Sequence, residues 1–203
     1  MQEQAAGALW GLALDNDEIK VKIAVAGAIS LLVGLLGAQS SAGVQEQAAG
    51  ALWGLAFNNA ENTAKIVAAG AIPALVALLG PQSSAGVQQH AAGALQSLAA
   101  NPDNKVKIAA AGAIAPLVAL LGPQSSAGAQ EQAAGALRNL ATNPDNRIEI
   151  VAAGAISPLV ALLGPQSSAG VQEQAGGALQ NLAVDNAENK VMIRYAGAVG
   201  ALN

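Results

Sequence analysis

The chain contains five copies of one short segment, which reads MQEQAAGALWGLA in the first copy. The copies begin at Met1, Val44, Val87, Ala129 and Val171, and their spacings are 43, 43, 42 and 42 residues. A unit of this size cannot bury its apolar face alone, so tandem copies stack into a solenoid in which each repeat contacts its neighbours. Such an array presents rows of equivalent side chains, whereas an enzyme needs unlike groups at one point. The repeat therefore favours a binding or scaffolding protein over an enzyme.

The composition excludes several kinds of function. The chain is 53% hydrophobic and only 11% charged, and its formal net charge is -4, without the basic stripe expected of a nucleic-acid-binding protein. It has no Cys, which excludes a thiolate nucleophile, a disulfide and a Cys-based metal site. His90 is the only histidine and has no second ligand at metal spacing. We therefore expect no enzyme activity, no metal and no cofactor.

The longest apolar run covers residues 23–38 and falls short of the roughly 18 to 20 residues that a membrane span needs. It is also interrupted by Gly27, which favours two buried helices over a span. The N-terminus lacks the basic and apolar regions of a secretory signal. These features predict no membrane contact and favour an intracellular location, but they leave the compartment open.

Residues 101–141 illustrate how one repeat is built. Asn101 and Pro102 can begin a first helix that ends at Gly112, a second helix follows up to Gly122, and Ser125 or Ser126 can cap a third helix. This pattern predicts an isolated third helix at 1–14, complete repeats at 15–57, 58–100, 101–142 and 143–184, and a partial repeat at 185–203. The partial repeat should hold a first helix and the start of a second one.

The string NxxNKxxIxxAGAIxPLVxLLG, followed by VQEQAAxALRNLA, resembles the armadillo repeat along the whole chain. HEAT repeats are the alternative, but they usually have two helices and lack the GAIxPLVxLL junction. The resemblance implies an all-α, right-handed superhelix, an α-solenoid with three helices per 42-43-residue repeat. It also implies that the third helices line a concave groove, where an extended peptide from a protein partner lies antiparallel to the array.

In importin-like armadillo repeats, the third helix carries a ladder of Trp and a ladder of Asn. The register of ALRNLA places the Asn row at Gly11, Gly54, Ser97, Asn139 and Asn181. The Trp row falls on Gly7, Gly50, Gly93, Gly135 and Gly177. The resemblance thus implies that Asn139 and Asn181 hold the peptide backbone. Since only two Asn rungs remain, we expect weak binding.

Two further rows should border the groove. One consists of Gln4, Gln47, His90, Gln132 and Gln174, and the other of Trp10, Trp53, Gln96, Arg138 and Gln180. Trp10 and Trp53 could form apolar or cation-binding shelves, and Arg138 could contact a carboxylate. The interpretation that we favour for the indole rings is simpler: they fill the space left by the neighbouring Gly11 and Gly54. His90 is expected to make a polar contact in the groove or on the surface.

Two other features concern the surface and the ends of the array. Glu3, Glu46, Glu131 and Glu173 form an acidic row, which we interpret as a solvated helix face rather than as a site for basic peptides. Apolar side chains at both ends could support head-to-tail self-association, and they are Leu9, Leu12, Val199 and Leu202. The alternative to a peptide-binding scaffold is therefore a structural or designed array that has no dedicated ligand and associates through uncapped ends.

Overall fold

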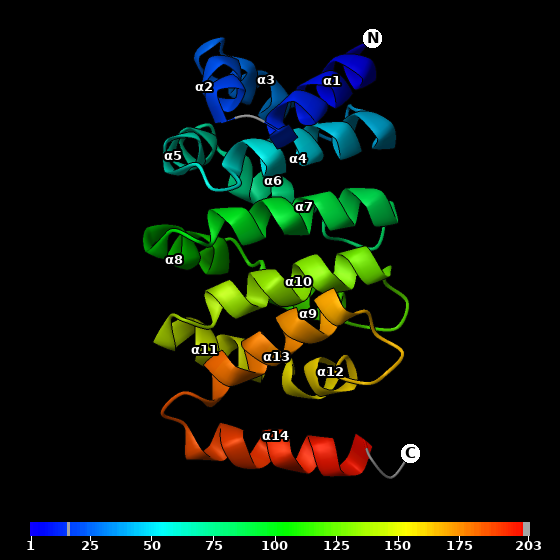
Figure 1. Cartoon of the computed structure of the whole chain (residues 1–203), viewed down its shortest axis with the longest axis vertical. Helices are drawn as coiled ribbons and strands as arrows, with labels where there is room; N and C mark the ends of the chain where they lie inside the picture. The colour runs from blue at the N-terminus through cyan, green and yellow to red at the C-terminus, as the bar shows by residue number, and fades with distance from the viewer. Residues whose placement is uncertain (16, 201–203) are drawn as a thin grey trace.

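The computed structural model describes residues 1–15 and 17–200, which form fourteen helices and no strands. Five long helices correspond to the recurring segment and lie side by side in one layer (Figure 1). They are α1 (Gln2–Asp15), α4 (Ala42–Ala56), α7 (Ala85–Leu98), α10 (Ala127–Leu140) and α13 (Ala169–Ala183). We call them the third helices, because each one completes a repeat.

Each of the intervals 15–57, 58–100, 101–142 and 143–184 also holds a first and a second helix. The first helices are α2 (Asp17–Val25), α5 (Ala60–Ala68), α8 (Pro102–Ala110) and α11 (Pro144–Ala152). The second helices are α3 (Ala28–Leu35), α6 (Ala71–Ala77), α9 (Ile114–Ala119) and α12 (Ile156–Ala161). The first helices follow one edge of the stack in Figure 1. The chain is thus an α-solenoid with three helices per repeat.

Side-chain caps begin the four internal third helices and three of the first helices. Ser126 accepts a hydrogen bond from the backbone N–H of Ala129 and caps α10, while Ser41, Ser84 and Ser168 cap the other internal third helices in the same way. Asn101 caps α8, with Pro102 in its first turn. An N-cap side chain satisfies a backbone N–H that has no partner inside the helix. The prediction of Asn101 as a cap is therefore confirmed, and Ser126 rather than Ser125 caps the third helix.

The core is a continuous stripe of Leu, Ile and Ala between the layers. Leu52, Leu95 and Leu137 occupy the same register in successive third helices and are fully buried. The apolar runs of the sequence form the short second helices that cover this stripe. Among the described residues, no helix is long and apolar enough to cross a bilayer. The hydrophobic content is accounted for by packing between repeats.

A glycine with a positive φ separates the first helix from the second in every complete repeat. The φ angles are 80° at Gly27, 80° at Gly70, 77° at Gly112 and 80° at Gly154. We expect Gly112→Ala to destabilise the protein by about 1–2 kcal/mol, because a Cβ is unfavourable in the left-handed region. Urea unfolding of the variant checks this. Gly34→Ala is the control, since Gly34 is helical and has open space around its Cα; an equal loss in both variants would contradict the explanation.

The last described helix, α14 (Ala187–Gly200), differs from the prediction. The sequence predicts a first helix followed by the start of a second, but α14 continues through Gly197 without a turn. In the complete repeats, the second helix packs against the third helix that follows it. No such helix follows α14 among the described residues, and α14 lies along α12 instead. The prediction of a turn was wrong because the turn depends on that packing.

Candidate functional site

From the second copy onward, the glycine row of the third helices is covered by side chains from the preceding third helix. A methyl group placed on Gly50 would lie 2.9 Å from Cδ2 of Trp10, and one on Gly93 would lie 2.7 Å from Cδ2 of Trp53. The side chains of Gln96 and Arg138 cover Gly135 and Gly177 in the same way. The repeated glycine is therefore explained by close approach between repeats.

This arrangement corrects the expectation about the two indole rings. They do fill space above glycines, but these glycines belong to the next repeat. Nothing lies within 4 Å of a methyl group placed on Gly11, and Gly54 faces Ala13. The sequence suggested Gly11 and Gly54 because they directly follow the two Trp residues. The stacking of the third helices instead decides which glycine lies beneath each ring.

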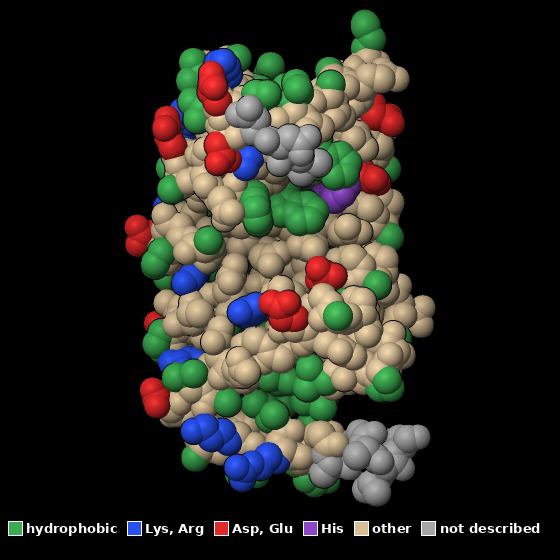
Figure 2. All heavy atoms as spheres, in the orientation of Figure 1, with side chains coloured by type: hydrophobic (Ala, Val, Ile, Leu, Met, Phe, Trp, Pro, Cys, Tyr) green, Lys and Arg blue, Asp and Glu red, His purple; other side chains and the backbone are tan. Residues whose placement is uncertain are grey.

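His90 lies between the two indoles on the same face of the stack. It is 6% exposed, and its ring centroid is 4.5 Å from that of Trp10, edge-on at 64°, and 6.0 Å from that of Trp53. Its Nδ1 lies 3.1 Å from the backbone carbonyl oxygen of Glu46. Figure 2 shows the single histidine among hydrophobic side chains on the face formed by the third helices. Trp10, Trp53 and His90 thus form an aromatic cluster between repeats.

The acidic row also makes contacts between repeats. The carboxylate groups of Glu3, Glu46 and Glu131 lie over Gly43, Gly86 and Gly170 respectively. Each of these glycines is in the first turn of the next third helix, where free N–H groups and the helix dipole favour a negative charge. Ser84 Oγ also donates a hydrogen bond of 3.5 Å to Glu46. The row is therefore more than a solvated face, because it joins successive helices.

A groove of about 590 Å³ runs along α7 and α10 on the face shown in Figure 2. Five of the predicted groove residues line it together, namely Trp53, Ser97, Gln132, Asn139 and Gln174. The remaining five do not line this groove. Trp10 and His90 belong to the aromatic cluster, and the side chain of Gln47 covers Gly7. Arg138 donates a hydrogen bond of 3.3 Å to Gln174 Oε1 and lies 3.7 Å from Glu173 Oε1.

Asn139 and Asn181 make equivalent hydrogen bonds within the stack. Asn139 Nδ2 donates to the carbonyl oxygen of Gln96 at 2.9 Å, and Asn181 Nδ2 donates to that of Arg138 at 2.8 Å. An amide has two N–H donors and a carbonyl acceptor. Each side chain is thus fixed by one hydrogen bond and retains a second N–H and Oδ1 for other partners. At the preceding position of the row, Ser97 lines the groove instead.

The sequence interpretation missed one end of the groove. Phe57 and Asn59 line it from the turn after α4, Ala100 and Asn101 from the turn after α7, and Thr63 from α5. The connection from the last Leu of the third helix to the next first helix is one residue longer after α4 than after α7, and it contains Asn58 at a φ of 54°. The difference in length was visible in the sequence, but it indicated only a tolerated insertion. The position of these turns beside the groove depends on the stacking of the repeats.

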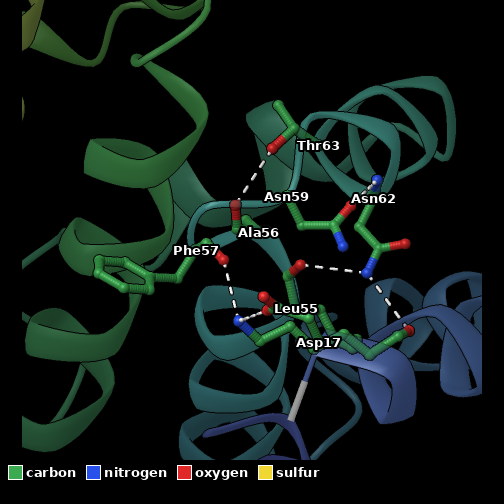
Figure 3. A network of polar contacts seen from close by, with 8 residues as sticks. Asp17, Leu55, Ala56, Phe57, Asn59, Asn62 and Thr63 are labelled. Carbon is green, nitrogen blue, oxygen red and sulfur yellow. Dashed lines mark hydrogen bonds and ion pairs between the residues drawn. The ribbon is translucent and has the colours of Figure 1, made fainter.

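A second missed feature is a row of buried asparagines in the first helices. Asn62 Nδ2 donates hydrogen bonds to the carbonyl oxygens of Leu55, at 3.2 Å, and Lys20, at 3.3 Å (Figure 3). The equivalent Asn146 joins Leu140 and Lys105, and Asn104 donates to Leu98. These side chains satisfy carbonyl groups at the ends of the third helices. The row is structural and holds the turns beside the groove in place.

The described side chains offer no clear catalytic arrangement. No group of three or more His, Cys, Asp or Glu residues that could hold a metal ion occurs among them. Of the predicted end residues, Leu12 is exposed and Leu9 is half-buried against the core. Leu202 and the side chain of Val199 lie outside the described part of the chain. Head-to-tail association through these residues therefore stays a prediction.

Comparisons with known proteins agree on one repeat type. The model of the armadillo/beta-catenin-like repeat matches residues 16–57, 59–100, 101–142 and 143–184. A crystal structure of an engineered protein is 35% identical, covering 99% of this chain and 82% of its own, with a TM-score of 0.89. No curated protein sequence matches the chain.

Two further solved structures are designed armadillo repeat proteins. One is 35% identical with a TM-score of 0.86, covering 98% of this chain and 83% of its own. The other, described in complex with the peptide (KR)4, is 36% identical with a TM-score of 0.83, covering 98% of this chain and 82% of its own.

Proposed function

Since the chain belongs to the armadillo/beta-catenin-like repeat family, we propose that it is a non-catalytic scaffold that binds an extended peptide in the groove along α7 and α10. The observation that carries the proposal is the groove itself, which joins Trp53, Ser97 and Asn139 on the face of the third helices. A similar designed protein is described in complex with a peptide, which supports this class of ligand.

The two asparagines are suited to the backbone of an extended peptide. A peptide unit presents one N–H and one carbonyl group, and each asparagine retains an acceptor and a donor after its hydrogen bond within the stack. That bond also fixes the side chain before the ligand arrives, which lowers the entropy lost on binding. Asn139 lies in the groove, and Asn181 would extend the contact by one repeat.

We expect the binding to be weak. The glycine row leaves no ladder of aromatic rings, because the two indoles are stacked on Gly50 and Gly93. Arg138 and Gln174 are also bonded to each other. A ligand therefore meets only two asparagine rungs. Each hydrogen bond to them contributes a net free energy of about 0.5–1.5 kcal/mol.

A peptide array with binding curves for its hits tests the proposal. The double variant Asn139→Ala plus Asn181→Ala should lose about tenfold or more in affinity, since at least two hydrogen bonds disappear. Thermal unfolding of the same variant controls for loss of the fold. A control variant, Lys22→Ala on the exposed face of α2, should bind as the parent does.

The alternative is an array that has no dedicated ligand. It is favoured by the number of groove-facing side chains whose contacts lie within the stack, such as Arg138 over Gly177. No binding across a diverse peptide array would support this alternative and contradict the scaffold. Binding that the double variant retains would contradict the assignment of the two asparagines.

A further inference from the structure

One stripe of α1 is exposed, although the equivalent stripe of every other third helix is buried. It consists of Ala5, Ala8 and Leu12, which lie three and four residues apart and so share one face of the helix. Leu12 is 49% exposed, whereas its counterparts are fully buried, namely Leu55, Leu98, Leu140 and Leu182. The counterparts of Ala5 and Ala8 are buried as well. The stripe is therefore a core face that the described residues leave open.

The helix α14 lacks a third helix to pack on. From the second complete repeat onward, the first and second helices both contact the third helix that follows them. No third helix follows α14 among the described residues. Ile193 of α14 is half-buried, whereas the equivalent isoleucines of the complete repeats are buried, namely Ile23, Ile66, Ile108 and Ile150. Thus α14 offers a core side chain without a third helix, and α1 offers a third helix with an open core face.

A cavity of about 810 Å³ opens between α12 and α14. Leu163 lines it and is 44% exposed, whereas the equivalent Leu79 and Leu121 are 2% exposed. Met192 and Tyr195 line it from α14, and its described lining contains no charged side chain. The open surface around α14 is therefore apolar, and it includes a position that is part of the core in the preceding repeats.

Two polar side chains at this surface also lack the partner that their counterparts have, and the first is Gln180 of α13. It belongs to a row whose other members each cover a glycine of the next third helix, namely Trp10, Trp53, Gln96 and Arg138. Gln180 is exposed. Among the described residues, Gly7 is the one glycine of its row that no side chain of a preceding third helix covers. The side chain of Gln180 and the surface of Gly7 are thus two halves of the same contact.

The second is Lys190 of α14. At the equivalent position, Lys20 Nζ donates to the carbonyl oxygen of Phe57 at 3.0 Å, and Arg147 NH1 donates to that of Val184 at 2.9 Å. Both carbonyls lie at the C-terminus of the following third helix, where partial negative charge favours a cation. Lys190 is exposed, and its Nζ makes no hydrogen bond or ion pair to another described residue. A third helix packed on α14 would supply the missing acceptor.

We propose that a second copy of this chain covers both surfaces, with α1 of one molecule packed against α13 and α14 of another. The two surfaces lie at opposite ends of the stack in Figure 1, so one molecule cannot join them by itself. In this contact Leu12 and Ile193 share one core. Gln180 then covers Gly7, and Lys190 reaches the C-terminus of α1. A second copy fits better than an unrelated protein, because each open position meets the kind of partner that it has between the repeats of one molecule.

The contact is heterologous, since the two surfaces differ, and it forms a ring if the rotation closes and an open filament if it does not. Analytical ultracentrifugation of the 203-residue chain at increasing concentration tests it. The mean mass of the parent should rise with concentration and pass that of a dimer. Leu12→Glu should weaken the association at least about tenfold, because it places a carboxylate in the shared core. Val106→Glu is the control, since Val106 is exposed in an internal first helix, and it should associate as the parent does.

A mixture of two blocked variants tests the direction of the contact. Leu12→Glu blocks the surface of α1, and Ile193→Glu blocks that of α14. Each variant alone should stay monomeric, because a head-to-tail contact needs both surfaces, whereas an equimolar mixture should form a heterodimer that does not grow further. Circular dichroism and thermal unfolding check that the variants fold. If Ile193→Glu loses helix content, Lys190→Glu takes its place, since Lys190 is exposed.

Three results would overturn the contact: a parent that stays monomeric up to its solubility limit, unchanged association of Leu12→Glu, or a mixture of the blocked variants that forms no heterodimer. Dimers of either blocked variant alone would show a contact between like surfaces and would also overturn it. The inference does not depend on the peptide scaffold. The double variant Asn139→Ala plus Asn181→Ala should therefore associate as the parent does, and a loss of association in it would place the contact in the groove instead.

Discussion

We expect Gly93→Ala to lower the free energy of unfolding, because the added methyl group overpacks the contact between repeats at a usual cost of about 1–3 kcal/mol. The added methyl group would lie 2.7 Å from Cδ2 and 2.8 Å from Cε2 of Trp53. The indole is rigid and lies beside His90, so it must lift away from α7. Alanine also gains about 1 kcal/mol in helix propensity, so the net loss should reach about 2 kcal/mol.

Gly176→Ala is the matched control, because Gly176 lies in a third helix beside Gly177. A methyl group at Gly176 would meet only Leu163 Cδ2, at an ordinary distance of 3.8 Å. The equivalent positions in other repeats hold the buried alanines Ala49, Ala92 and Ala134. This variant should be more stable by about 0.5–1 kcal/mol. Urea unfolding monitored by circular dichroism measures both. An equal gain in the two variants would show that Trp53 does not require a glycine beneath it.

The largest loss is expected for Asn62→Ile, at about 2–4 kcal/mol, since the Leu55 carbonyl at the end of α4 loses its donor and the hydrogen bond to the Lys20 carbonyl of α2 is also lost. Isoleucine is the chosen replacement because Ile19 occupies the equivalent position in the first repeat. Asn104→Ile is the control, because Asn104 Nδ2 makes a single such bond, to Leu98 at 3.1 Å. It should lose about half as much.

Chemical unfolding of both asparagine variants, with the parent as reference, measures the two losses. Equal losses would contradict the explanation by hydrogen bonds and would indicate a packing effect instead. The comparison also concerns the groove, since Asn62 holds the turn that contains Phe57 and Asn59.

Most of the fold could be predicted from the sequence, because its signals are local. The caps at Asn101 and Ser126 and the stop at Gly112 each act within a few residues of the chain. Repetition then gives every copy the same signals. The turn expected after the last first helix is absent, and α14 continues through Gly197. Local signals did not predict this, because the turn also needs a following helix on which the second helix can pack.

The candidate site could be predicted only in part. The resemblance gave the positions of Asn139 and Asn181, and half of the predicted groove residues line one groove. The sequence did not indicate that the two amides are bonded to the preceding helix. These contacts join residues about 40 positions apart, and their partners depend on the offset between stacked helices.

The spacing of the recurring segment by itself determined that the chain is an array of stacked repeats, because a unit of this size must bury its apolar stripe against similar neighbours. The segment also determined that a glycine recurs in every third helix. Only the tertiary structure decided what lies on that glycine: Trp10, Trp53, Gln96 and Arg138 reach it from the preceding repeat. The physical reason is that hydrogen bonds along the backbone specify a helix locally, whereas the distance and offset between helices follow from the packing of the whole stack.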